Sequence, residues 1–182
     1  MQALPVRSAE AAPELSRIAF FSRTSVETAS AKPAGKSEVA GAREVAGKRD
    51  WDKVMLDTRA AFDNLKGTGR IGITGFCMGG TVAFLGATRI PGIAAASGFY
   101  GGQIVPFMGE KPLCPTELHF GEQDPHIPMS DVEIVKQKRP DVEVFVYPAG
   151  HGFSCDERGS YHEASHKQAL ERTLGLLKKC VG

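Results

Sequence analysis

The chain has 182 residues, and its 22 Lys and Arg residues nearly balance its 21 Asp and Glu residues. This length suffices for one hydrophobic core that buries about 70% of the unfolded surface. The sequence has no stripe of basic residues, so we expect no nucleic-acid partner. No apolar run approaches the roughly 18 residues of a membrane span and no segment resembles a secretory signal, so we expect a cytoplasmic protein without a membrane partner.

The amino-terminal quarter differs in composition from the rest of the chain. Residues 1–48 are rich in Ala, Ser, Lys, Glu and Gly, and their one apolar cluster lies at residues 15–21. Such a composition offers little apolar surface to bury, and residues 29–48 are typical of a linker. We expect a poorly ordered or divergent segment over residues 1–48 and one folded domain over residues 49–182.

From Asp50 onward, helical and strand patterns alternate along the chain. Asp50 is a helix cap, and Gly67 and Gly69 end the helix that it begins. The following pattern predicts strands at 70–76, 92–99, 116–120 and 142–147, and helices at 78–89, 129–138 and 160–179. Strands alternating with helices indicate an α/β fold, a mostly parallel sheet with flanking helices and right-handed crossovers.

The connection between the strand at 70–76 and the helix at 78–89 is the most informative segment. It reads Gly-Phe-Cys-Met-Gly-Gly over residues 75–80, with Cys77 at the apex of a sharp strand-to-helix turn. This is the geometry of a nucleophile elbow, in which glycines permit close packing and the helix amino terminus favours an anion. A thiol at this place is a usable nucleophile as its thiolate. The alternative is a tight connection that holds a small buried thiol.

Two further predicted strands end in residues that could complete such a site. Asp124 lies on a turn after the strand at 116–120, and His151 lies between two glycines after the strand at 142–147. The carboxyl ends of parallel strands carry the functional loops of an α/β sheet, so we expect both side chains near Cys77. Taken singly, Asp124 could be a turn residue and His151 a solvated surface residue.

The order nucleophile, acid, histidine is that of the α/β-hydrolases. Together with the sequences Gly-Phe-Cys-Met-Gly-Gly, His-Phe-Gly-Glu-Gln-Asp-Pro-His-Ile-Pro and Gly-His-Gly-Phe, it makes residues 50–182 resemble the dienelactone hydrolase family. The resemblance implies an ester or lactone hydrolase with Cys77 as nucleophile, Asp124 as orienting acid and His151 as base. It also implies a thioester acyl-enzyme, a small-molecule substrate and no cofactor.

The chain departs from this family in its amino-terminal part, because the several strands that precede the nucleophile strand in the family are not evident. We therefore expect an amino-terminally incomplete α/β-hydrolase fold in which the Met78 backbone N–H is the identifiable oxyanion donor. The exposed edge of the nucleophile strand would be covered by residues 18–21 or by a second copy in a homodimer. Phe153 and Arg158 are the candidates for substrate binding.

Two other interpretations remain open. His162-Glu163-Ala164-Ser165-His166 matches H-E-x-x-H, so a zinc hydrolase is conceivable, although these histidines share a helical stripe with Leu170 and Leu174 that would border the face packed on the sheet. Because the amino-terminal strands are not evident, the chain could also be a degenerate, inactive hydrolase fold that serves as a binding or dimerisation module. Cys77, Cys114, Cys155 and Cys180 lack C-x-x-C spacing, and we expect free thiols and no metal.

Overall fold

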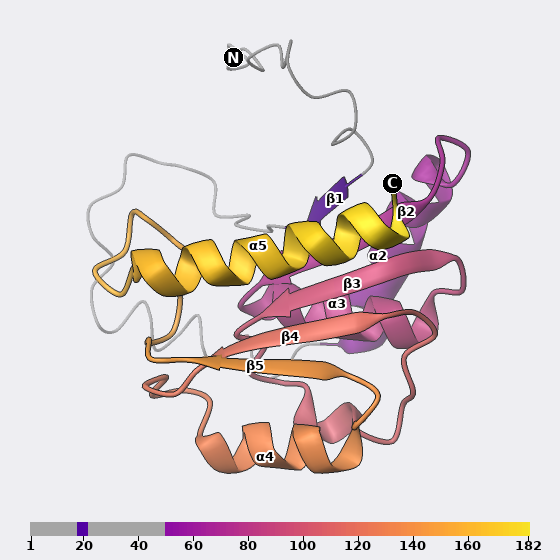
Figure 1. Cartoon of the computed structure of the whole chain (residues 1–182). Coiled ribbons are helices and arrows are strands. Elements are labelled where there is room, and N and C mark those ends of the chain that lie inside the picture. Colours follow the sequence, from indigo (N-terminus) through magenta and orange to yellow (C-terminus); the bar gives the residue numbers. More distant parts are fainter. Residues whose placement is uncertain (1–17, 22–49) are drawn as a thin grey trace, which may run out of the picture.

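The computed structural model describes residues 18–21, as backbone, and residues 50–182 (Figure 1). Its centre is a five-stranded sheet in which every neighbouring pair of strands is parallel and the spatial order follows the chain. The strands are β1 (Ile18–Phe21), β2 (Ile71–Phe76), β3 (Ile93–Phe99), β4 (Thr116–Gly121) and β5 (Glu143–Tyr147). The predicted α/β class and parallel sheet are confirmed.

Strand β1 covers the edge of the strand that leads to Cys77. Its residues pair with β2 from Ile18 opposite Gly72 to Phe21 opposite Gly75. The prediction that residues 18–21 lie on this edge is therefore confirmed. The expectation of poor order over the remainder of 1–48, and the boundary near residue 49, lie outside the described residues.

The helices lie on both faces of the sheet. Helix α5 (Glu163–Cys180) crosses the front face in Figure 1, whereas α2 (Trp51–Leu65) and α3 (Met78–Arg89) lie behind the sheet. Helix α4 (Met129–Lys138) lies below β5, and the short 3-10 helix η2 (Val105–Phe107) contacts it. Asp50 caps α2 as predicted, because its carboxylate accepts hydrogen bonds from the Asp52 and Lys53 backbone N–H groups.

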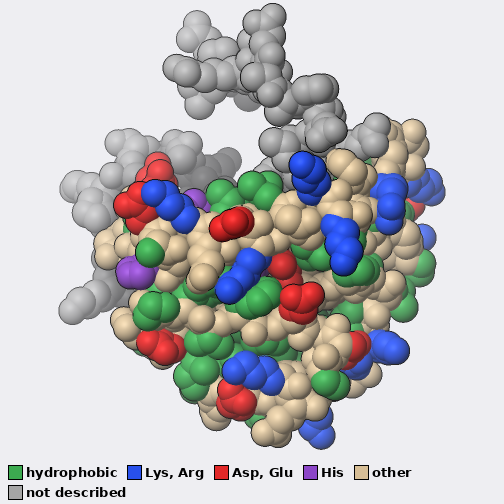
Figure 2. Space-filling model, viewed as in Figure 1, with side chains coloured by type: hydrophobic (Ala, Val, Ile, Leu, Met, Phe, Trp, Pro, Cys, Tyr) green, Lys and Arg blue, Asp and Glu red, His purple; other side chains and the backbone are tan. Residues whose placement is uncertain are grey.

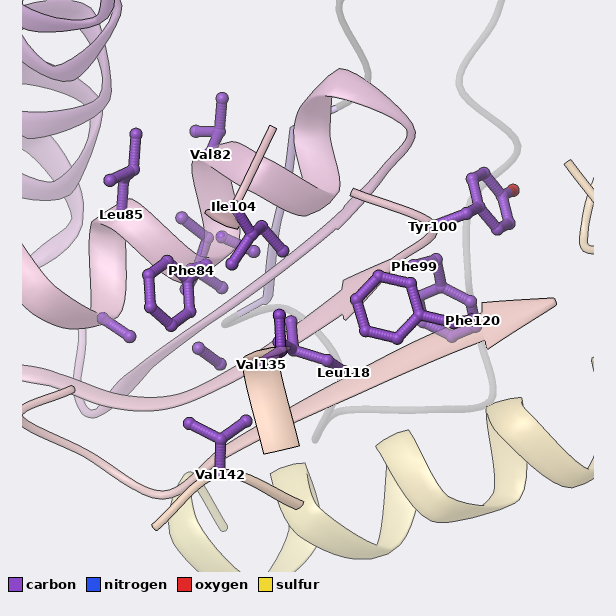
Figure 3. Packing of buried hydrophobic residues seen from close by; sticks show 14 of the residues in the cluster. Val82, Phe84, Leu85, Phe99, Tyr100, Ile104, Leu118, Phe120, Val135 and Val142 are labelled. Atoms are coloured by element: carbon purple, nitrogen blue, oxygen red, sulfur yellow. The ribbon is translucent and has the colours of Figure 1, made fainter. Parts of the chain in front are cut away.

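Helix α3 packs so closely on the sheet that several glycines at this contact leave no room for a side chain. A Cβ on Gly75 would lie 2.2 Å from the Gly79 carbonyl oxygen, and one on Gly80 would lie 2.4 Å from the Phe99 carbonyl oxygen. Farther along α3, the buried side chains face the apolar core shown in Figure 3. The labelled core residues include Val82, Phe84, Leu85, Leu118 and Phe120. This packing fixes the start of α3, and hence Cys77, against β2 and β3.

Helix α5 is held to the sheet partly by a buried polar network. The Thr173 hydroxyl donates a hydrogen bond of 2.8 Å to Glu117 and lies 2.8 Å from the Ser97 hydroxyl. The carboxylate of Glu117 also lies 3.0 Å from Nε2 of His119, and all four residues are buried. The sequence pattern did not reveal this network.

The packed face of α5 corrects one expectation. The buried positions are Ser165, Ala169, Thr173, Leu177 and Cys180. Leu170 and Leu174, on the stripe that the sequence pattern placed at the border of the packed face, are 39% and 42% exposed. Thr173 reaches the sheet because it joins the polar network, whereas Leu177 and Cys180 pack beside Ala95 in a small apolar cluster. Hydrophobicity alone therefore did not identify the buried stripe. Figure 2 views this side of the molecule, where charged side chains are interspersed with hydrophobic ones.

Two features bear on the environment of the chain. Within residues 18–21 and 50–182, none of the helices combines the length and apolar character that a membrane crossing requires. All four cysteines carry free thiols.

Candidate active site

Cys77 lies at the junction between β2 and α3, where the backbone adopts a conformation that few L-residues accept. Its φ angle is 54°, in the left-handed region, and it occupies the position before the first residue of α3. Its backbone N–H donates to the Phe99 carbonyl oxygen at 2.9 Å, which ties the turn to the end of β3. The side chain is exposed at the carboxyl end of the sheet, where a substrate can reach it.

The two other predicted residues meet Cys77 there. Nδ1 of His151 lies 2.7 Å from Oδ2 of Asp124, and its Nε2 lies 3.3 Å from Sγ of Cys77. The Asp124 side chain is fully buried, and its second oxygen accepts a 2.8 Å hydrogen bond from the His126 backbone N–H. Residues that are 74 and 27 positions from His151 thus form one chain of contacts that runs from carboxylate to imidazole to thiol.

Electrostatics favour charge separation within this chain of contacts. The hydrogen bond from His151 lowers the pKa of Cys77 below its ordinary value, although burial opposes the shift. Burial would lower the pKa of His151, but hydrogen bonds to Asp124 and Cys77 and the charges of both groups outweigh it and raise that pKa to about 9. The Met78 backbone N–H also lowers the pKa of Cys77. The geometry therefore favours a thiolate beside an imidazolium.

The two candidates for substrate binding lie in different surroundings. Phe153 is fully buried, and its ring packs against those of Tyr100 and Tyr147 at 5.4 and 5.2 Å. Arg158 is exposed and lies over the backbone of Gly152, where an added Cβ would come within 3.2 Å of its Cδ. After the contribution of His151, its positive charge adds to the lowering of the pKa of Cys77. Arg158 is therefore close to Cys77, whereas Phe153 lies in the core and packs against the rings of Tyr100 and Tyr147.

The H-E-x-x-H segment does not form a metal site among the described residues. His162 precedes the first residue of α5 and accepts a hydrogen bond from the Ser165 backbone N–H, so its ring caps the helix. His166 lies one turn further along, with its ring 5.6 Å from that of Tyr161. No group of three potential metal ligands occurs within the part of the chain that the structure describes. The structure thus gives the zinc interpretation no support.

Sequence reasoning did not single out Tyr100, which directly follows β3. Its ring lies 5.0 Å from that of His151, and its φ angle is 40°. The available signal was positional: the residue ends a buried strand at the same edge of the sheet as Asp124 and His151, and precedes Gly101-Gly102.

Comparison with known proteins gives a consistent family and fold. Residues 26–181 match the profile of the Dienelactone hydrolase family. A relative from Synechocystis sp., named "Putative carboxymethylenebutenolidase", is 35% identical over 123 residues, which cover 59% of this chain and 50% of that protein. A crystal structure named "Putative Dienelactone Hydrolase", from Klebsiella pneumoniae, has 34% identity and a TM-score of 0.54, covering 60% of this chain and 52% of the other.

A more distant structure shows the same fold. The Pyrococcus furiosus esterase has 20% identity and a TM-score of 0.59, over 72% of this chain and 63% of that one. The chain spans about half the length of the curated relatives that it matches.

Proposed function

Because this chain belongs to the dienelactone hydrolase family, we propose that it hydrolyses small carboxylic esters or lactones through a thioester acyl-enzyme. The observation that carries the proposal is the continuous contact from Asp124 through His151 to Cys77, at 2.7 and 3.3 Å. A nucleophile, a base within reach of it and a third group that orients the base are the requirements of covalent acyl transfer.

In the proposed mechanism the Cys77 thiolate attacks the acyl carbon. The Met78 N–H, which already faces Sγ, then donates to the oxyanion that develops. The protonated His151 gives its proton to the leaving oxygen, so that a thioester to Cys77 remains. His151 next removes a proton from water, which attacks the thioester and releases the acid. Asp124 keeps the imidazole oriented throughout, and no step needs a cofactor.

Arg158 suggests which esters the site prefers. Arg158 is exposed, and its positive charge is close enough to Cys77 to lower the pKa of that thiol. We infer that it attracts substrates with a carboxylate beyond the scissile bond. Arg158→Gln should raise KM for an anionic ester, such as a succinate monoester, more than for its neutral methyl ester. Equal changes for the two substrates would contradict this assignment.

The test of the whole proposal is hydrolysis of a short-chain p-nitrophenyl ester, with intact mass recorded for an acyl adduct. The wild type should turn over the ester, and Cys77→Ala should lose both turnover and adduct. Cys114→Ala is the matched control, because burial raises the pKa of that thiol to about 11 and leaves it unreactive. Folded wild-type protein without turnover or adduct would contradict the proposal and favour a hydrolase fold that only binds.

A homodimer is a separate proposal that rests on the sheet edge. Among the described residues, β1 pairs with β2 on one side and with no strand on the other. An open edge presents backbone donors and acceptors to a second strand. Sedimentation over a range of concentrations should show a dimer, and a single species of monomer mass at every concentration would refute it.

A further inference from the structure

Tyr100 has a backbone conformation that sets it apart from most of the protein. Within the described residues, Cys77 and Tyr100 are the non-glycine residues with positive φ, at 54° and 40°. Such conformations cost free energy and persist where the surrounding structure imposes them, often at functional sites. One of the two is the proposed nucleophile, and the other lies beside the proposed base.

The contacts of Tyr100 and of the preceding Phe99 reach the three segments that carry the proposed catalytic residues. Its backbone N–H donates to the His119 carbonyl oxygen of β4 at 2.7 Å, on the strand that leads to Asp124. The carbonyl group immediately before it, that of Phe99, accepts the N–H of Cys77. Its ring contacts His151 directly. Tyr100 thus joins the acid strand to the histidine loop, and its neighbour Phe99 ties the same point of the chain to the nucleophile turn.

The phenol group reaches the same histidine loop. The backbone N–H of Ser154, three residues after His151, is near enough to the phenol oxygen to lower the pKa of the phenol. Tyr100 is only 3% exposed, and Figure 3 shows its ring beside that of Phe99 at the border of the core. Burial raises the pKa of this phenol, so the hydroxyl stays neutral over the working pH range.

We propose that Tyr100 is a positioning residue for His151: its hydroxyl oxygen anchors the loop at Ser154, and its ring supports the imidazole. Both contacts keep Nε2 of His151 at Sγ of Cys77. Without the hydroxyl, the Ser154 N–H loses this nearby oxygen and the loop gains freedom, so the imidazole spends less time on the thiol. The proposal rests on the proposed function, but the contact between Cys77 and His151 can be measured without any hydrolysis.

Tyr147 offers a matched control from the same aromatic cluster. It is also buried, it packs against Phe153, and its hydroxyl accepts a hydrogen bond from Arg172 at 2.9 Å and lies 2.8 Å from Nδ1 of His119. Its hydroxyl contacts lie under α5 and not at the histidine loop. Tyr147→Phe therefore removes a buried hydroxyl of the same kind and reports general loss of packing and hydrogen bonding.

The experiment compares the wild type, Tyr100→Phe and Tyr147→Phe by the rate at which iodoacetamide alkylates Cys77 between pH 5 and 10, read by peptide mass. In Tyr100→Phe the apparent pKa of the thiol should rise by about one unit, because the imidazolium partner is less well placed. For ester hydrolysis, kcat should fall about tenfold while KM stays within about twofold, as expected for misplacement of a catalytic group.

The other outcomes are also decisive. Tyr147→Phe should unfold at a lower temperature yet keep the wild-type thiol pKa and KM. A Tyr100→Phe protein with native circular dichroism and an unchanged thiol profile would overturn the proposal. So would equal shifts in both variants, since they would indicate a general structural effect. Tyr100→Leu, which also removes the ring, should shift the thiol at least as far. If the wild type hydrolyses no ester, the proposed function fails while the thiol comparison still tests Tyr100.

Discussion

At the scale of single residues, the reactivity of the site depends on how Cys77 and His151 alter each other. Each makes the charged form of its neighbour more favourable, and Asp124 favours the charged imidazole from the opposite side. An exposed thiol with a lowered pKa is a reactive thiol. Cys114 shows the contrast, because burial raises its pKa to about 11 in the same protein.

The pH dependence of Cys77 alkylation tests this coupling. The pKa of the thiol is lowered from 9.0, so the wild type should retain a thiolate below pH 9 and lose it only as pH falls through the lowered value. His151→Ala removes the main cause of that shift, so its alkylation midpoint should rise toward that of an ordinary thiol. Iodoacetamide rates at Cys77 measure both profiles. Superimposable profiles would show that the imidazole does not affect the thiol.

Asp124→Asn tests the orientation of the imidazole. The amide cannot supply the negative charge that raises the pKa of His151, and it can stabilise the wrong tautomer. We expect kcat for a p-nitrophenyl ester to fall by about 10² to 10⁴-fold. Glu122→Gln, two residues away and exposed, is the matched control and should remain near the wild-type rate. Comparable rates in all three proteins would remove Asp124 from the mechanism.

The residues that the sequence predicted differ in kind from those that it missed. Cys77, Asp124 and His151 were found because each follows a predicted strand, and parallel strands bring such positions to one edge. Tyr100 has the same placement but an ordinary aromatic side chain, so its role depends on contacts between β3, β4 and the histidine loop. Those contacts arise only from the tertiary fold, which explains why a pattern along the chain did not reveal them.

At the scale of elements, the close contact between β2 and α3 is what presents Cys77 to solvent. The sequence predicted α3 with its observed ends, Met78 and Arg89, because glycines and an apolar run mark the turn and the helix. It predicted α5 less well: the helix begins at Glu163 because His162 caps it, and its buried face includes a polar network. The helix η2 was not predicted, since three residues carry no periodic signal.

Gly75→Ala tests the contact between β2 and α3. The new methyl group would lie 2.2 Å from a backbone oxygen of α3, so the helix must shift. We expect a loss of about 3 kcal/mol in the free energy of unfolding, measured by urea titration, together with slower alkylation of Cys77. Gly175→Ala is the control on α5, where nothing lies within 4 Å, and it should gain about 0.5 to 1 kcal/mol. A neutral Gly75→Ala would show that the two elements are not in close contact.

Thr173→Val tests the polar attachment of α5. The change keeps the shape of the side chain but leaves the Ser97 hydroxyl and the Glu117 carboxylate each without one partner. Burying polar groups without partners should cost about 1 to 3 kcal/mol of unfolding free energy. A double-mutant cycle with Ser97→Ala isolates the pair, and the two losses should not add. Strict additivity would mean that the two hydroxyls do not interact.

At the scale of the whole molecule, the proposed site lies at one edge of the sheet in a chain that spans about half the length of its curated relatives. The proposed triad needs only β2, β4 and β5 with their following loops, and β3 supplies Tyr100 between them. These strands and α5 lie within residues 71–180. The contacts that act on the Cys77 thiol therefore lie within these elements and their following loops.

The strands lie side by side in the order in which they are synthesised. Because each strand lies next to its predecessor in the chain, the sheet can grow from its amino-terminal edge as the polypeptide leaves the ribosome. His151 follows the last strand, long after Cys77 has been synthesised. Until residue 151 arrives, Cys77 lacks the partner that lowers its pKa and behaves as an ordinary thiol. We expect the nascent protein to acquire its reactive sulfur late, after most of the sheet has formed around it.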